Sequence, residues 1–282
     1  MPSSASSAVS KKGQRINRIV ATRHIRRMPG GSQSHLMLCN DGNLYVVKFC
    51  NNPQHYKVLA NEMLVTRLAG HVGLPVPECA VVEVCEALVD SSLTIQLKGT
   101  TIPCDAGLHF GSRYAVDPLR GQVFDFFPSA MLNRVRNLET FAGMLAMDKW
   151  TGNADNRQAV FVRQSREKMY QSRFIDHGYC FNAGAWTFPD RALWGLFPDR
   201  AVYALVRGWE SFEPWLSRIE RFNEDVTWRF AEAIPVEWYS GDWYALESLM
   251  ERLLNRRKVV RRLLIELRDA PHNLFPKWDS GG

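Results

Sequence analysis

The chain has 282 residues, of which 46% are hydrophobic and 23% are charged, and its 35 basic against 29 acidic residues give a formal net charge of +6. This composition is typical of a folded globular protein with one large domain or two small ones. It excludes wholesale disorder, a collagen-like fibre and a coiled coil. No stretch approaches the roughly 20 apolar residues of a membrane span, and the polar first ten residues do not resemble a secretory signal.

The first part of the chain predicts a small β-rich lobe that carries one helix. Residues 1–13 are rich in Ser, Ala, Lys and Gly, which is typical of a disordered basic tail, and β-branched residues indicate a first strand within 14–25. The turn Asn40-Asp-Gly-Asn43 between two short apolar runs predicts a hairpin. Periodicity gives the remaining elements, which are strands at 36–39, 44–49 and 79–84 and a helix over 54–69.

Beyond residue 125 the pattern becomes mainly helical. The expected elements are a helix over 138–150, short strands at 159–162 and 174–176, and amphipathic segments over 201–233 and 243–268, the last a helix with one buried face. We therefore expect an α+β protein in which residues 14–125 form the β-rich lobe and residues 126–282 the helical one.

Three features of the β-rich part could belong to a phosphate-binding site. The first is the loop Gly30-Gly31-Ser32-Gln33-Ser34-His35, whose glycines allow consecutive amides to point at one anion, although a glycine pair between strands is more often an ordinary hairpin. Lys48 lies within an apolar strand, where it needs an anionic partner if it is buried and none if it faces solvent. Glu62, in the middle of the next helix, could be that partner.

Two carboxylates in the second part form the strongest signal. Asp155 lies in a polar turn between a helix and a strand, and Asp176 ends an apolar strand just before Gly178. One such carboxylate can accept a proton while the other binds Mg²⁺. Each aspartate alone would more often be a helix cap or a turn residue. Both aspartates in this order, each next to an apolar strand, are much less expected by chance.

The order of these groups matches the parts that phosphoryl transfer from ATP requires, and the sequence resembles the HipA-like kinase family of bacteria. The resemblance lies in Gly30-Gly-Ser-Gln-Ser-His35, Tyr45-Val-Val-Lys-Phe49, Asn61-Glu62 with Gly73-Leu-Pro-Val-Pro77, Trp150-Thr-Gly-Asn-Ala-Asp155 and Phe174-Ile-Asp-His-Gly178. It implies a bilobal, protein-kinase-like fold with ATP between the lobes.

The resemblance also implies roles for the candidate residues. The loop over residues 30–35 would cover the phosphates through its amides, and Lys48, held by Glu62, would neutralise the α- and β-phosphates. Asp155 would orient or deprotonate the attacking hydroxyl, and Asp176 would bind Mg²⁺.

The sequence departs from the family pattern at one position. Kinase-type loops place a metal-binding Asn five residues after the catalytic Asp, where this chain has Val160. Gln158 could offer its carbonyl oxygen to the metal instead. Asp148 with Asn153 has the expected spacing and forms a second possible register, but we favour Asp155 because it directly precedes the strand.

We therefore expect an ATP- and Mg²⁺-dependent kinase that phosphorylates a hydroxyl, foremost of a protein serine or threonine. A small molecule or a lipid would need the same parts, so the acceptor class stays open. The alternative, which Val160 favours, is a catalytically weak or silent nucleotide-binding module that contacts a regulatory protein partner.

The positive charge is concentrated at the two ends of the chain. Residues 1–40 hold seven basic and no acidic side chains, and residues 251–282 hold eight and four, which leaves 20 basic and 25 acidic residues in 41–250, net −5. A basic arm over residues 11–27 could contact nucleic acid, but a solvated tail is the commoner case, so we do not expect that partner. Six scattered cysteines without a Cys-x-x-Cys pair indicate reduced, mostly buried thiols and a cytoplasmic protein.

Overall fold

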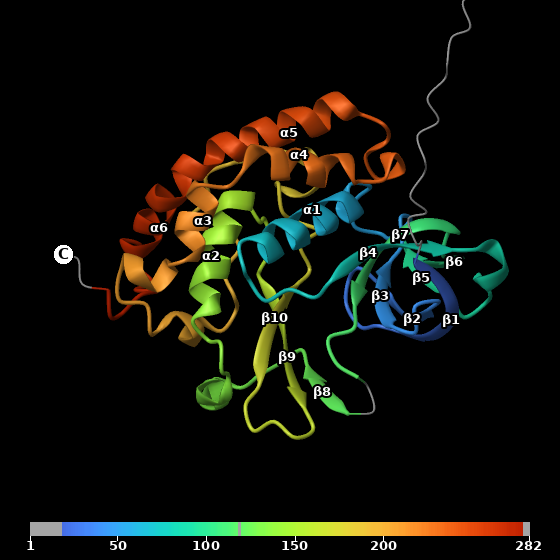
Figure 1. Ribbon diagram of the computed structural model, residues 1–282, viewed down its shortest axis with the longest axis horizontal. Coiled ribbons are helices and arrows are strands. Elements are labelled where there is room, and N and C mark those ends of the chain that lie inside the picture. Colours follow the sequence, from blue (N-terminus) through green and yellow to red (C-terminus); the bar gives the residue numbers. More distant parts are fainter. Residues whose placement is uncertain (1–18, 118–119, 279–282) are drawn as a thin grey trace, which may run out of the picture.

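The computed structural model describes residues 19–117 and 120–278, and strands and helices are mixed along this part of the chain (Figure 1). The strands are β1 (Ile19–Arg27), β2 (His35–Cys39), β3 (Leu44–Lys48), β4 (Cys79–Val84), β5 (Thr94–Leu97), β6 (Thr100–Pro103), β7 (Gly107–Arg113), β8 (Gly121–Phe124), β9 (Gln158–Gln164) and β10 (Gln171–Ile175). The α-helices are α1 (Val58–His71), α2 (Thr140–Thr151), α3 (Trp215–Glu220), α4 (Glu224–Glu232), α5 (Trp243–Arg256) and α6 (Val260–Arg268). Short 3₁₀ helices are η1 (Glu86–Leu88), η2 (Ser129–Arg134), η3 (Ala183–Ala185), η4 (Arg200–Tyr203), η5 (Trp209–Phe212), η6 (Val236–Tyr239) and η7 (Arg257–Val259).

Five strands close into a barrel in the order β1-β2-β3-β7-β4, with β1 and β4 parallel and the other neighbours antiparallel. The predicted hairpin is confirmed as β2–β3. Its turn places Gly42 at φ +77°, and the carboxylate of Asp41 accepts hydrogen bonds from the Asn43 amide at 3.0 Å and the Tyr45 hydroxyl at 2.9 Å. The predicted first strand is observed as β1 from Ile19 onward, and residues 14–18 lie outside the described chain.

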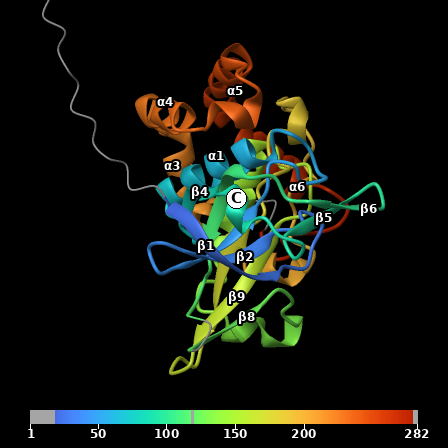
Figure 2. The same ribbon diagram turned by 90° about the vertical axis from the view of Figure 1, so that its right-hand side faces the viewer.

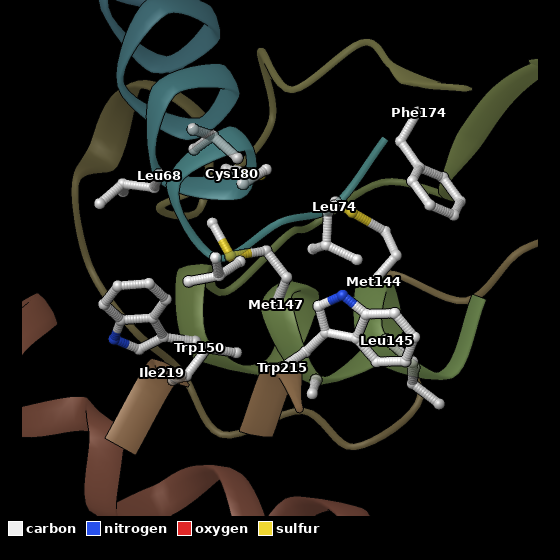
Figure 3. Packing of buried hydrophobic residues seen from close by; sticks show 14 of the residues in the cluster. Leu68, Leu74, Met144, Leu145, Met147, Trp150, Phe174, Cys180, Trp215 and Ile219 are labelled. Carbon is white, nitrogen blue, oxygen red and sulfur yellow. The ribbon is translucent and has the colours of Figure 1, made fainter. Parts of the chain in front are cut away.

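Helix α1 packs between the barrel and the other helices. Eleven of its fourteen residues are buried, and its apolar side chains belong to the same hydrophobic core as those of α2 and α3. Figure 3 shows Leu68 of α1, Met147 and Trp150 of α2 and Ile219 of α3 gathered in this core. The predicted helix over 54–69 is confirmed, but it begins four residues later, at Val58.

A second sheet has the order β10-β9-β8 and packs against α2, where the Phe141 ring contacts Phe161 and Phe174. In the view of Figure 2, β8 and β9 extend away from the side of the molecule where α4 and α5 lie. Strand β8 precedes the expected domain boundary at 125/126 yet pairs with β9, which follows it. The boundary itself stays a prediction.

The helix predicted over 243–268 is confirmed as α5 and α6, joined by the single turn η7. All the apolar residues whose spacing predicted it are buried, namely Leu246, Leu249, Met250, Leu253, Leu254, Val260, Leu263, Leu264 and Leu267. The segment 201–233 is instead broken into η4, η5, α3 and α4, and Pro214, which lacks an amide hydrogen, directly precedes α3.

Ion pairs take up most of the basic residues near the C-terminus. Arg256 and Arg262 both reach Asp190, and Arg262 also bonds Glu266 at 2.5 Å. Three further pairs are Arg257–Glu224, Arg261–Glu220 and Arg268–Asp269. The positive charge of this end is therefore matched locally, and residues 1–18 of the basic arm lie outside the described chain.

All six cysteines are free, and three of them, Cys39, Cys104 and Cys180, are buried. Cys79 is partly exposed, whereas Cys50 and Cys85 are exposed, so the expectation of mostly buried thiols holds for about half of them. Among the described residues, no helix combines the length and the apolar character needed to cross a bilayer.

Two buried histidines predict that the protein loses stability in mild acid. Burial lowers the pKa of His35 and of His109 from 6.5 to about 4, and each ring donates a hydrogen bond to a backbone carbonyl, of Thr94 and Asp105 respectively. Between pH 6.5 and 4 these two histidines bind protons in the unfolded chain but stay neutral in the folded chain. The free energy of unfolding therefore falls as the pH falls.

Urea unfolding at pH 7 and pH 5 checks this. We expect a loss on the order of 1–2 kcal/mol for each histidine at pH 5. His109→Gln should weaken this pH dependence, whereas His272→Gln, a change at an exposed position, should leave it as in the wild type. Equal unfolding midpoints at the two pH values would contradict the prediction.

Candidate active site

Lys48 is the centre of a buried cluster of three charges. It ends β3, is 7% exposed, and its ammonium donates hydrogen bonds to Oε1 of Glu62 on α1 and to Oδ1 of Asp176 after β10, the latter at 2.6 Å. Burial alone would lower the pKa of Lys48, but the two carboxylates outweigh it, so this pKa lies above its ordinary value. The predicted pairing of the strand lysine with the helix glutamate is therefore present, and Asp176 joins it.

The ammonium also sets the charge of Asp176. Burial would raise the pKa of this carboxyl, but Lys48 overrides the effect and holds it at about 2. Asp176 is therefore ionised throughout the neutral range, as a ligand for a cation would have to be.

Glu62 additionally fixes the turn that follows Asp176. Its Oε2 accepts the amide hydrogen of His177 and its Oε1 that of Gly178, both at 3.0 Å. Asp176 lies at φ +60°, and a Cβ at residue 178 would come within 2.5 Å of the Val58 side chain. The close approach of this turn to α1 explains why glycine stands at position 178.

Arg157 joins the second sheet to α2 at full burial. Its guanidinium bonds both carboxylate oxygens of Asp148, one of them through Nε at 2.9 Å, and it donates to the carbonyls of Ile175 and Asp176 at 2.9 and 3.2 Å. Because Ile175 pairs with Gln158, the end of β10 and the start of β9 lie side by side. Arg157 thereby fixes the backbone from which Asp176 projects.

The cluster opens into a cavity of about 320 Å³. Eight of the residues predicted for the site line it: Gly30, Gly31, Ser32, Ser34, Lys48, Glu62, Gln158 and Asp176. Val160, the position at which the sequence departs from the family pattern, lines it too. Apolar walls come from β3, β7, β8 and β10, namely Val46, Phe110, Val123 and Phe174.

The loop between β1 and β2 closes on itself beside this cavity. The Met28 amide donates to the Ser34 carbonyl at 2.8 Å and the Gln33 amide to the Gly30 carbonyl at 3.2 Å. Gly30 has φ +113°, a conformation open to glycine rather than to residues with a Cβ. We call residues 28–34 the glycine loop.

Gln33 and His35 are not among the residues that line the cavity. The Gln33 side chain bonds the backbone of Gln96 in β5, and the His35 ring bonds the Thr94 carbonyl and the His24 ring, each at 3.0 Å. Ser32 and Ser34 therefore face the cavity, while Gln33 and His35 face the barrel and the β5–β6 hairpin.

Asp155 lies in the polar turn before β9, outside the residues that line the cavity. Its Oδ1 accepts the Asn156 amide at 2.7 Å, and its own amide donates to Asn153 at 3.1 Å. Within the described chain, Oδ2 of Asp155 takes part in no hydrogen bond, whereas the Asp148 carboxylate is fully buried by Arg157 and Asn153. Of the two possible registers, only Asp155 offers an oxygen that is not already engaged.

Two structural residues of the site, Arg157 and Asn61, were given no role in the sequence analysis. Arg157 had no signal, because its partner Asp148 lies in another element. Asn61 had one, since a buried polar residue inside an apolar helix needs partners. Its Nδ2 lies 2.8–3.0 Å from the carbonyls of Gly178, Cys180 and Ala183, and its Oδ1 accepts the Trp186 indole hydrogen at 2.8 Å, which attaches the segment after Asp176 to α1.

A model of the HipA-like kinase family matches residues 21–194. No curated protein matches the chain. Among solved structures, the Helicobacter pylori proinflammatory kinase CtkA is similar with a TM-score of 0.56 at 16% identity, over 89% of this chain and 98% of that one. The Golgi casein kinase is similar at 13% identity over 94% and 77%, with a TM-score of 0.46, or 0.43 for its form with Mn/ADP bound. The likeness to CtkA shows a kinase-like fold.

Proposed function

The chain belongs to the HipA-like kinase family, and from this premise we propose that it transfers the γ-phosphoryl group of ATP, with Mg²⁺, to a hydroxyl of a protein serine or threonine. The observation that carries the proposal is the buried cluster of Lys48, Glu62 and Asp176, which opens into the same cavity as the glycine loop. We also propose that the cavity separates two lobes, 14–125 and 126–282, and that the protein acts in the cytoplasm.

The positions of the chain's residues support a division of roles. Lys48 would hold the α- and β-phosphates, with Glu62 keeping its ammonium in place, and the amides of the glycine loop would cover the phosphates. Asp155, through its free Oδ2, would orient the acceptor hydroxyl and take its proton. Most of the rate gain would come from positioning and from cations near the transferred group.

Asp176 and Gln158 would hold the metal ion. They project from adjacent strand ends, and their carboxylate and amide oxygens are the donors that suit a hard divalent cation. When bound, Mg²⁺ would neutralise the negative charge on the phosphates.

Val160 favours a second candidate function, a module that binds nucleotide with weak or no turnover and acts by contact with a regulatory protein. This valine lines the cavity opposite Arg173 in the β9–β10 register, at the position where the family pattern has a metal-binding asparagine. One metal ligand fewer would slow phosphoryl transfer while leaving the lysine and the glycine loop able to bind ATP.

Incubation with γ-labelled ATP, Mg²⁺ and a mixture of protein substrates tests the proposal. We expect the wild type to incorporate label into protein and Asp155→Ala to lose this incorporation by roughly 10²- to 10⁴-fold, the usual contribution of a proton acceptor. Asp269→Ala, a change at an exposed residue paired with Arg268, is the matched control and should retain the wild-type rate.

Three other outcomes would redirect the assignment. Thermal stabilisation by ATP without label transfer would favour the silent module. Label transferred to a small molecule or a lipid would keep the kinase and change the acceptor. No stabilisation by ATP and no transfer would contradict both functions.

A further inference from the structure

The β5–β6 hairpin packs against the outer side of the glycine loop. It belongs to the connection between β4 and β7, and it forms its own two-stranded sheet outside the barrel. Figure 1 shows it at the barrel end of the molecule, away from α2 and α6. None of its residues lines the cavity, so any effect of the hairpin on a bound nucleotide must pass through the loop.

Gln33, which closes the turn of the loop, makes the connection. Its Nε2 donates to the Gln96 carbonyl at 2.8 Å, and its Oε1 accepts the Gln96 amide at 2.6 Å. The side-chain amide thus pairs with both main-chain groups of one β5 residue, as a neighbouring strand would. Arg27, at the end of β1, donates to the same Oε1.

The backbone at Gln33 fits this role. Its φ of +49° lies in the left-handed region, which a residue with a Cβ rarely adopts unless contacts hold it there. This conformation turns Gln33 toward the hairpin while Ser32 and Ser34 remain buried at the cavity. Glycine would adopt the same backbone more easily but could form none of the side-chain bonds.

A second connection lies at the end of the loop. His35 donates to the Thr94 carbonyl, and its other ring nitrogen bonds His24, whose ring in turn bonds Ser92 at 3.0 Å. The hairpin strand β5 is thus attached through Gln33, near the end of the loop, and through His35, where the chain enters β2.

We propose that the β5–β6 hairpin braces the glycine loop and that Gln33 is a positioning residue for nucleotide binding. The inference rests on the proposed function, since it takes the cavity to be the nucleotide site. A loop held in its binding conformation loses little conformational freedom when the phosphates arrive, so the brace raises affinity without touching the ligand. Because the Gln33 side chain does not line the cavity, we expect it to affect binding and not the chemical step.

Nucleotide binding and turnover of Gln33→Ala and Gln33→Met, measured with Mg-ATP, test the brace. We expect both variants to bind roughly tenfold more weakly, as the loss of one or two hydrogen bonds implies, with KM for ATP raised in proportion and kcat at saturating ATP within about twofold of wild type. The matched control is Gln96→Ala, because Gln96 holds Gln33 through its main chain and its side chain only bonds Thr101.

Hydrogen exchange of residues 28–34 without nucleotide gives a readout that does not depend on function. We expect faster exchange in both Gln33 variants and wild-type exchange in Gln96→Ala. The brace would be overturned if exchange and nucleotide affinity were unchanged in the Gln33 variants, or if Gln96→Ala weakened nucleotide binding as much as they do. Either result would leave the proposed function intact. If the wild type binds no nucleotide but the Gln33 variants still exchange faster, the proposed function and the positioning role are both overturned. Gln33 would then be a structural contact only.

Discussion

Asp176→Asn is expected to lower phosphate transfer by on the order of 10³-fold while leaving the fold intact. The substitution removes the negative charge that faces Lys48 and would face the metal ion, and charge placed next to the transferred group is usually the largest contribution to such a rate. Asparagine keeps the shape of the side chain and tolerates the left-handed φ of +60° at this position. Initial rates of label transfer from ATP measure the effect.

The control for this variant must separate charge from structure. The amides of His177 and Gly178 remain bonded to Glu62 in Asp176→Asn, so the turn should keep its structure, while the thermal midpoint should fall because the ion pair with Lys48 is lost. Asp176→Glu restores the charge but lengthens the side chain, and we expect only partial recovery. A rate for Asp176→Asn above a tenth of the wild-type rate would argue against Asp176 as the metal ligand.

Arg157→Met is expected to destabilise the protein by about 3–5 kcal/mol, the cost of leaving one member of a buried ion pair without its partner. Both side chains of the pair are at most 1% exposed, and the change would strand the carboxylate of Asp148 inside the core. It would also remove the bonds that hold the Ile175 and Asp176 carbonyls. Urea unfolding followed by tryptophan fluorescence gives the free energy.

A double variant and a surface variant sharpen this experiment. Replacing both partners, as in Asp148→Leu with Arg157→Met, should recover part of the stability, because no uncompensated charge stays buried. Arg262→Met breaks pairs that are about half exposed and should cost less than about 1 kcal/mol. Equal losses of stability for Arg157→Met and Arg262→Met would contradict the conclusion that the buried ion pair of Arg157 stabilises the fold.

Local signals in the sequence predicted much of the fold. The turn at residues 40–43 sets its own hairpin, because Asp41 and Gly42 favour that turn whatever surrounds it. The buried face of α5 and α6 follows from residue spacing alone. The pairing of Lys48 with Glu62 was predictable for a different reason, namely that a charge inside an apolar strand must find a partner.

What the sequence could not provide depends on contacts between distant segments. The conformation of the loop and its contacts with the β5–β6 hairpin decide whether Gln33 faces the cavity. No pattern within residues 94–103 predicts that this hairpin contacts the loop. The engagement of Asp148 by Arg157 has the same origin, since neither residue signals where the other lies. Asp155 falls outside the cavity lining although it directly precedes β9, the reason for which the sequence favoured it, and its role stays a prediction.

The burial of α1 determines which movements the protein can use for control. Swinging this helix outward would part Glu62 from Lys48, but it would also expose Leu64, Leu68 and their apolar neighbours to water at roughly 1.5–3 kcal/mol for each side chain. Such a sum exceeds the 1–3 kcal/mol of a typical allosteric coupling. Displacing α1 would therefore cost too much free energy to serve as an inactive state. We expect any on–off control to act through the smaller, more exposed glycine loop.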